Sequence, residues 1–106
     1  MLSLKAGVKV KGLQPEILLA IMVAKEVFYE AGYPLIITSL LDGKHSKNSL
    51  HYSGNAVDYR SKHIKSYREK QEILKILQFR LGSDYDIILE GVGTTNEHYH
   101  VECHPK

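Results

Sequence analysis

The chain is poor in the features that most often identify a class of protein. It has one cysteine, Cys103, among its 106 residues, which excludes an intramolecular disulfide framework and a cysteine-rich zinc site. Its 14 basic and 12 acidic side chains leave a net charge of +2, which gives no reason to expect nucleic-acid binding. Its most apolar stretch, residues 17–24, is followed by Lys25 and is far shorter than the ~20 residues that cross a bilayer. We therefore expect neither a nucleic-acid partner nor membrane insertion.

The N-terminal residues also lack the continuous apolar run of a signal peptide, so we expect the protein to accumulate in the cytoplasm. A chain of 106 residues can bury one modest hydrophobic core. Residues 1–106 are therefore expected to form a single domain, and we expect that domain to be a monomer.

Two segments have the apolar periodicity of helices. In residues 14–31, apolar side chains recur every three or four positions after Pro15, and Gly32 follows the last of them. The second helix is expected to begin after Ser66, because Ser66 and Glu69 have the spacing of a capping box, and to end before Gly82.

Four short segments have the composition of strands, namely residues 35–38, 56–60, 86–90 and 98–103. The last two are expected to form a hairpin, and residues 40–54 a long loop of the kind that usually carries function. The order of elements predicts an α+β fold: a small antiparallel sheet of about four strands with two helices packed on one face.

Histidine is the residue type that stands out, because five of the six histidines fall in residues 45–51 and 98–104. A catalytic zinc needs about three imidazole or carboxylate ligands and one open position. His51, Asp58 and His100 would supply these ligands if the strand that carries Asp58 lies beside the strand that carries His100. The small residues between His51 and Asp58 allow the chain to fold back so that the two side chains converge.

The same residues carry a resemblance to a known family. The chain resembles the zinc D-Ala-D-Ala carboxypeptidases and dipeptidases and the phage L-alanyl-D-glutamate endopeptidases, which share the Hedgehog/DD-peptidase fold. The two motifs that carry the resemblance are Ser49-x-His51-x-x-Gly54-x-Ala56-x-Asp58 and Glu97-x-x-His100.

The resemblance implies a function and a set of roles. It implies hydrolysis of the peptide stems of bacterial peptidoglycan, with a zinc-bound water as the nucleophile. By position it makes His51, Asp58 and His100 the zinc ligands, Glu97 the general base and Ser49 a polar contact to the substrate. The small size and the missing signal peptide fit an endolysin-like phage enzyme, which acts on the cell wall after release from the cytoplasm.

The identity of the general base stays open between two residues. The family spacing favours Glu97, which is three positions before His100. Strand alternation instead favours His98, since His98 and His100 would face one side of a regular strand and Glu97 the other.

One feature of the family is missing. Many relatives have an arginine just after the strand at residues 35–38, where its charge holds the substrate and the developing oxyanion. No arginine follows that strand here, and Lys44, His45 or Arg60 would have to supply the cation. A terminal carboxylate needs such a cation, so the absence weakly favours the endopeptidase over the carboxypeptidase.

A different class of function is also compatible with the motifs. The chain would be a non-catalytic, zinc-stabilised cell-wall-binding or structural module if the zinc had four protein ligands, since structural zinc sites are closed. Coordination by His98 together with His51, Asp58 and His100 would be the signature of that module.

Overall fold

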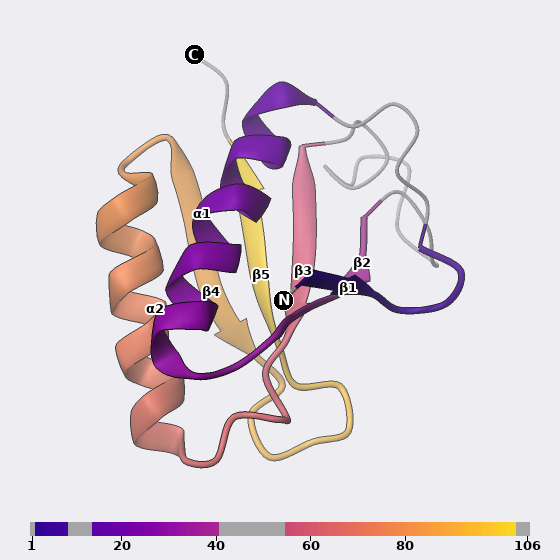
Figure 1. Ribbon diagram of the computed structural model, residues 1–106, viewed down its shortest axis with the longest axis vertical. Helices are drawn as coiled ribbons and strands as arrows, with labels where there is room; N and C mark the ends of the chain where they lie inside the picture. The colour runs from indigo at the N-terminus through magenta and orange to yellow at the C-terminus, as the bar shows by residue number, and fades with distance from the viewer. Residues whose placement is uncertain (1, 9–13, 41–54, 104–106) are drawn as a thin grey trace.

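The computed structural model describes residues 2–8, 14–40 and 55–103. In these residues two helices cover one face of a single five-stranded sheet (Figure 1). The sheet has the order β1-β2-β3-β5-β4, in which β1 is parallel to β2 and the other neighbours are antiparallel. The strands are β1 (Leu2–Leu4), β2 (Leu35–Ser39), β3 (Ala56–Arg60), β4 (Tyr85–Glu90) and β5 (His98–Cys103).

Both helices begin and end where the sequence predicts. Helix α1 (Pro15–Ala31) has proline in its first turn and ends at Gly32. Gly32 has a left-handed conformation with a φ of 89°, which glycine adopts with little steric strain. Helix α2 (Tyr67–Leu81) is capped by Ser66, whose side chain accepts a hydrogen bond from the backbone N–H of Glu69. In the described residues, neither helix is long and apolar enough to span a membrane.

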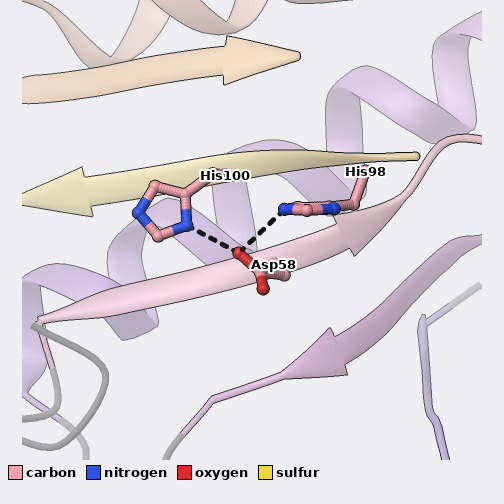
Figure 2. Close-up of side chains that lie close together, drawn as sticks. All are labelled: Asp58, His98 and His100. Carbon is pink, nitrogen blue, oxygen red and sulfur yellow. Dashed lines mark hydrogen bonds and ion pairs between the residues drawn. The ribbon is translucent and has the colours of Figure 1, made fainter. Parts of the chain in front are cut away.

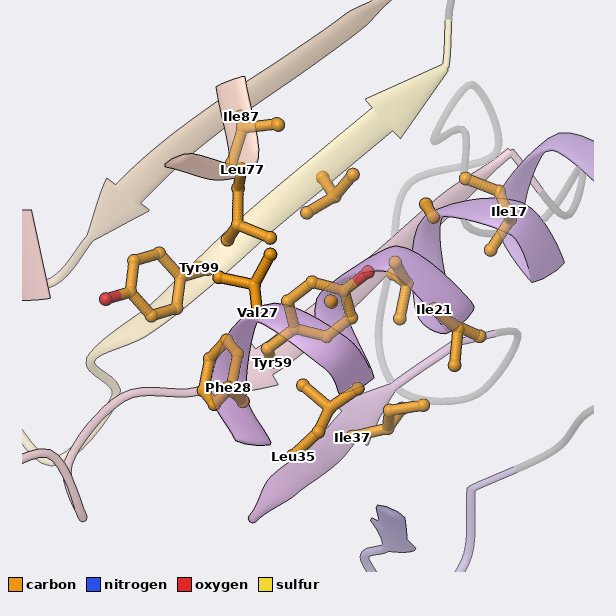
Figure 3. Packing of buried hydrophobic residues seen from close by; sticks show 14 of the residues in the cluster. Ile17, Ile21, Val27, Phe28, Leu35, Ile37, Tyr59, Leu77, Ile87 and Tyr99 are labelled. Carbon is orange, nitrogen blue, oxygen red and sulfur yellow. The ribbon is translucent and has the colours of Figure 1, made fainter. Parts of the chain in front are cut away.

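The core lies between the helices and one face of the sheet, where the side chain of Phe28 on α1 is fully buried (Figure 3). The ring centroid of Phe28 lies 6.2 Å from that of Tyr59 on β3 and 5.9 Å from that of Tyr99 on β5, both edge to face. This arrangement suits the charge distribution of aromatic rings. Because side chains alternate along a strand, the neighbours of Tyr59 and Tyr99 point to the face of the sheet that the helices leave uncovered.

The α+β class, the two helices and the hairpin of β4 and β5 are confirmed. The sheet differs from the prediction by one strand, since β1 adds a fifth and parallel member. The apolar alternation of β1 covers only three residues, all of them exposed, which is shorter than the 4–8 residues over which alternation indicates a strand. The predicted loop at residues 40–54 lies outside the described residues, except for Leu40, which is buried.

Candidate metal centre

Asp58, His98 and His100 meet on the face of the sheet opposite the helices (Figure 2). Asp58 of β3 is paired directly with His100 of β5, as predicted from the proposed adjacency of the two strands. His98 lies two residues before His100 and therefore points to the same face. The cluster thus depends on the pairing of β3 with β5, which brings together residues that are far apart in the sequence.

The donor atoms of the three side chains converge closely enough to hold one ion. The Oδ1 atom of Asp58 lies 2.7 Å from Nδ1 of His100 and 3.9 Å from Nε2 of His98. One donor atom from each residue lies within 4.8 Å of the other two. Two imidazoles and one carboxylate form a donor set that suits zinc and related divalent metals.

A backbone carbonyl determines the tautomer of His98. The Nδ1 atom of His98 lies 2.6 Å from the backbone oxygen of Asn96. A carbonyl oxygen only accepts, so Nδ1 is the nitrogen that carries the hydrogen. In the neutral ring, Nε2 is therefore left as an acceptor, and this is the nitrogen that faces Asp58.

The ring of His100 lies between two carboxylates. Its Nδ1 faces Asp58 and its Nε2 lies 2.7 Å from Oε1 of Glu102. The hydrogen bond to Asp58 raises the pKa of His100 to about 9 against the opposing effect of burial, and Glu102 contributes in the same direction. Both nitrogens of the protonated ring thus have acceptors.

Glu97 lies away from this cluster. Its side chain is buried, with Oε2 2.7 Å from Nζ of Lys70 on α2, and it accepts hydrogen bonds from the Ser61 hydroxyl and the Gly93 N–H. Burial alone would raise the pKa of Glu97, but the hydrogen bonds from Lys70 and Ser61 hold it below its ordinary value. Glu97 therefore points toward the helices, as strand alternation predicts, while His98 joins Asp58 and His100.

Four of the predicted site residues lie outside the described residues. They are the proposed zinc ligand His51 and the proposed substrate contacts Ser49, Lys44 and His45. Arg60, the other cation considered for the substrate, is described and is paired with His98 across β3 and β5. Its Nε atom is buried, and within the described part of the chain it has no hydrogen-bond partner.

Two acidic residues at the cluster were missed by the sequence analysis. Glu102 is two positions after His100, so strand alternation could have indicated that it shares the face of His100. Glu90 lies at the end of β4, opposite His98, with Oε1 3.4 Å from Nε2 of His98 and 4.0 Å from Nδ1 of His100. The position of Glu90 depends on the register of the hairpin, which the sequence does not specify.

The comparisons with known proteins found no matching family model, no similar curated protein and no similar solved structure. A groove of about 310 Å³ along the β4 edge is lined in part by His100 and Glu102, which gives a ligand access to this side of the cluster.

Proposed function

We propose that the protein is a zinc-dependent peptidase that hydrolyses the peptide stems of bacterial peptidoglycan. The observation that carries the proposal is the convergence of Asp58, His98 and His100 on the face of the sheet opposite the helices. The substrate class comes from the resemblance of the two sequence motifs to the zinc peptidases. The geometry supports the metal-binding part of the proposal, because it joins residues from both motifs.

In this proposal Asp58 and His100 are zinc ligands, and His51 is the third. A bound zinc ion supplies Lewis acidity, which polarises the scissile carbonyl and lowers the pKa of the attacking water. Asp58 and His100 are direct cross-strand partners, which places both donors on the same side of the sheet, 2.7 Å apart.

His98 is the stronger candidate for the general base. The Asn96 carbonyl leaves Nε2 of His98 as the proton acceptor, and this atom faces the same side as the donors of Asp58 and His100. Such a base takes a proton from the attacking water and returns it to the leaving amine. Glu97 is a weaker candidate, since its carboxylate is held by Lys70 on the helical side of the sheet.

Arg60 is the described residue best suited to replace the family arginine. It lies on the same strand face as Asp58 and opposite His98. Its side chain is only partly buried, so the charge of the guanidinium could attract a substrate carbonyl or carboxylate.

A second candidate function is a non-catalytic, zinc-stabilised cell-wall-binding or structural module. It is favoured by one observation, namely that Nε2 of His98 is close enough to Asp58 and His100 to act as a further ligand. Coordination by His98 in addition to His51 would close the site and leave no position for water.

The decisive experiment incubates the zinc-loaded protein with purified peptidoglycan and identifies the products by mass spectrometry. Released D-alanine indicates a carboxypeptidase, whereas a newly freed amino group on D-glutamate indicates an endopeptidase. Asp58→Asn is the inactive variant, and Glu30→Gln is the control, since it makes the same change of charge at an exposed position of α1. Zinc binding without any product would contradict the peptidase and support the closed module.

A further inference from the structure

We infer that Glu102 is a positioning residue that fixes His100 so that its Nδ1 atom, and not its Nε2 atom, is the one presented to the metal. The inference rests on the metal centre of the proposed function and adds a residue that neither sequence motif contains.

The contacts of His100 assign a separate partner to each ring nitrogen. Its Nδ1 lies 2.7 Å from Oδ1 of Asp58, the oxygen that His98 also faces. Its Nε2 lies 2.7 Å from Oε1 of Glu102, on the opposite edge of the ring. Asp58 and His98 are the other members of the cluster, so Nδ1 points toward the cluster and Nε2 points away from it.

The backbone explains why Glu102 reaches that nitrogen. Glu102 and His100 are alternate residues of β5, so their side chains leave the same face of the sheet next to each other. The side chain of Glu102 is 30% exposed and that of His100 is 17% exposed. The contact is therefore partly shielded from water, which weakens the competition of solvent for the Nε2 hydrogen.

The contact has a direct consequence for metal binding. A neutral imidazole, the form that binds a metal, carries one hydrogen. If Asp58 is itself bound to the metal, Glu102 is the carboxylate left to accept that hydrogen, which favours the tautomer in which Nε2 carries it. That tautomer leaves the lone pair of Nδ1 for the metal, and the negative charge of the carboxylate makes this lone pair more basic. Loss of such an outer carboxylate typically weakens metal affinity by 10–100-fold.

The first test measures zinc affinity by competition with a chromophoric chelator. Glu102→Gln keeps the size of the side chain but removes its charge, and we expect zinc to bind about 10–100-fold more weakly. Asp86→Asn is the matched control, because Asp86 is exposed, lies opposite Glu102 in the register of β4 and β5, and loses the same charge. We expect its effect to stay below about threefold, as for a screened surface charge. Equal losses in the two variants would overturn the inference.

The second test needs no variant and so does not depend on the folding of one. Long-range ¹H–¹⁵N NMR spectra of the zinc-loaded wild-type protein report which nitrogen of His100 carries a hydrogen. We expect a hydrogen on Nε2 and metal coordination at Nδ1, whereas coordination at Nε2 would overturn the inference.

The outcomes separate this inference from the proposed function. Zinc-dependent cleavage of peptidoglycan that is accompanied by coordination at Nε2 contradicts only the role of Glu102. Coordination at Nδ1 with no cleavage supports that role and contradicts only the peptidase. A wild-type protein that binds no zinc contradicts both.

Discussion

Asp58 and His100 are direct cross-strand partners on β3 and β5, and their side chains meet with Oδ1 and Nδ1 2.7 Å apart. The two residues are far apart in the sequence and belong to different motifs, yet one register places them together. A one-residue slip of β5 against β3 would turn His100 toward the core. Tyr99 and Val101, which flank His100 and are buried beneath the helices, oppose that slip, so the packing of the core holds the site in register.

The first prediction concerns the metal. Purified wild-type protein should bind about one zinc per chain, and Asp58→Asn should lose most of it, because the amide is a poor ligand and no longer attracts the cation. Elemental analysis and calorimetric titration measure this loss. Glu30→Gln on α1 makes the same change of charge and should keep full zinc binding. Undiminished binding by Asp58→Asn would contradict the assignment of Asp58 as a ligand.

The second prediction concerns pH and the metal-free protein. The pKa of His100 is about 9 in the folded state and 6.5 for an ordinary histidine, so the folded state binds the proton more tightly. The resulting stabilisation is fully present below about pH 6.5 and is lost as the pH rises to about 9. The free energy of unfolding should fall over this window by on the order of 3 kcal/mol from this group.

Urea denaturation at several pH values tests the second prediction. The variant His100→Asn cannot titrate and should lack this part of the pH dependence. If the wild-type protein and His100→Asn show the same dependence between pH 6.5 and 9, His100 is not held between carboxylates as described.

The fold was predictable where a local signal exists. The Ser66 and Glu69 pair marks the start of α2, because the Ser66 side chain accepts a hydrogen bond from the Glu69 backbone N–H in the first turn. The hairpin of β4 and β5 follows from two strand-like segments separated by a short turn. Strand β1 has no such signal, since its three residues are exposed and its partner β2 is about thirty residues away in the sequence.

The sequence was sufficient to predict which strands meet at the site, but not how the side chains are oriented there. Asp58 and His100 were proposed as ligands of one zinc ion, which requires their strands to be neighbours, and the two residues are paired directly across β3 and β5. The sequence does not indicate which ring nitrogen of each histidine carries the hydrogen. For His98 this depends on the backbone carbonyl of Asn96, and for His100 on the carboxylate of Glu102. Motif spacing favoured Glu97 as the base, but spacing does not report that Lys70 approaches its carboxylate from α2.

The third prediction separates the two candidates for the general base. His98→Ala should retain zinc through the proposed ligands but lose more than ~100-fold in turnover of a muropeptide. Glu97→Gln should keep most of its turnover once activity is corrected for the folded fraction, because its carboxylate lies on the helical side of the sheet. A larger loss of turnover in Glu97→Gln would identify Glu97 as the base. Loss of zinc by His98→Ala would instead favour the closed, non-catalytic module.

The fourth prediction gives Glu97 a structural role. Its carboxylate is 4% exposed and lies 2.7 Å from Nζ of Lys70, whose side chain is 15% exposed. Glu97→Gln removes the charged partner of the Lys70 ammonium group at this partly buried position, and we expect a loss of roughly 2–3 kcal/mol in the free energy of unfolding. The loss is measured by urea denaturation of the metal-free protein.

The same helix provides the matched control for Glu97→Gln. Glu72 pairs with Arg68, but the side chains of these two residues are 58% and 90% exposed, so Glu72→Gln should cost no more than about 0.5 kcal/mol. Adding Lys70→Met to Glu97→Gln removes the ammonium charge that has lost its partner, and it should recover part of the lost free energy of unfolding. Equal effects of Glu97→Gln and Glu72→Gln on the free energy of unfolding would show that Lys70 and Glu97 do not form a shielded pair. His98 would then lose its main structural support as the base, because Glu97 would no longer be held on the helical side of the sheet.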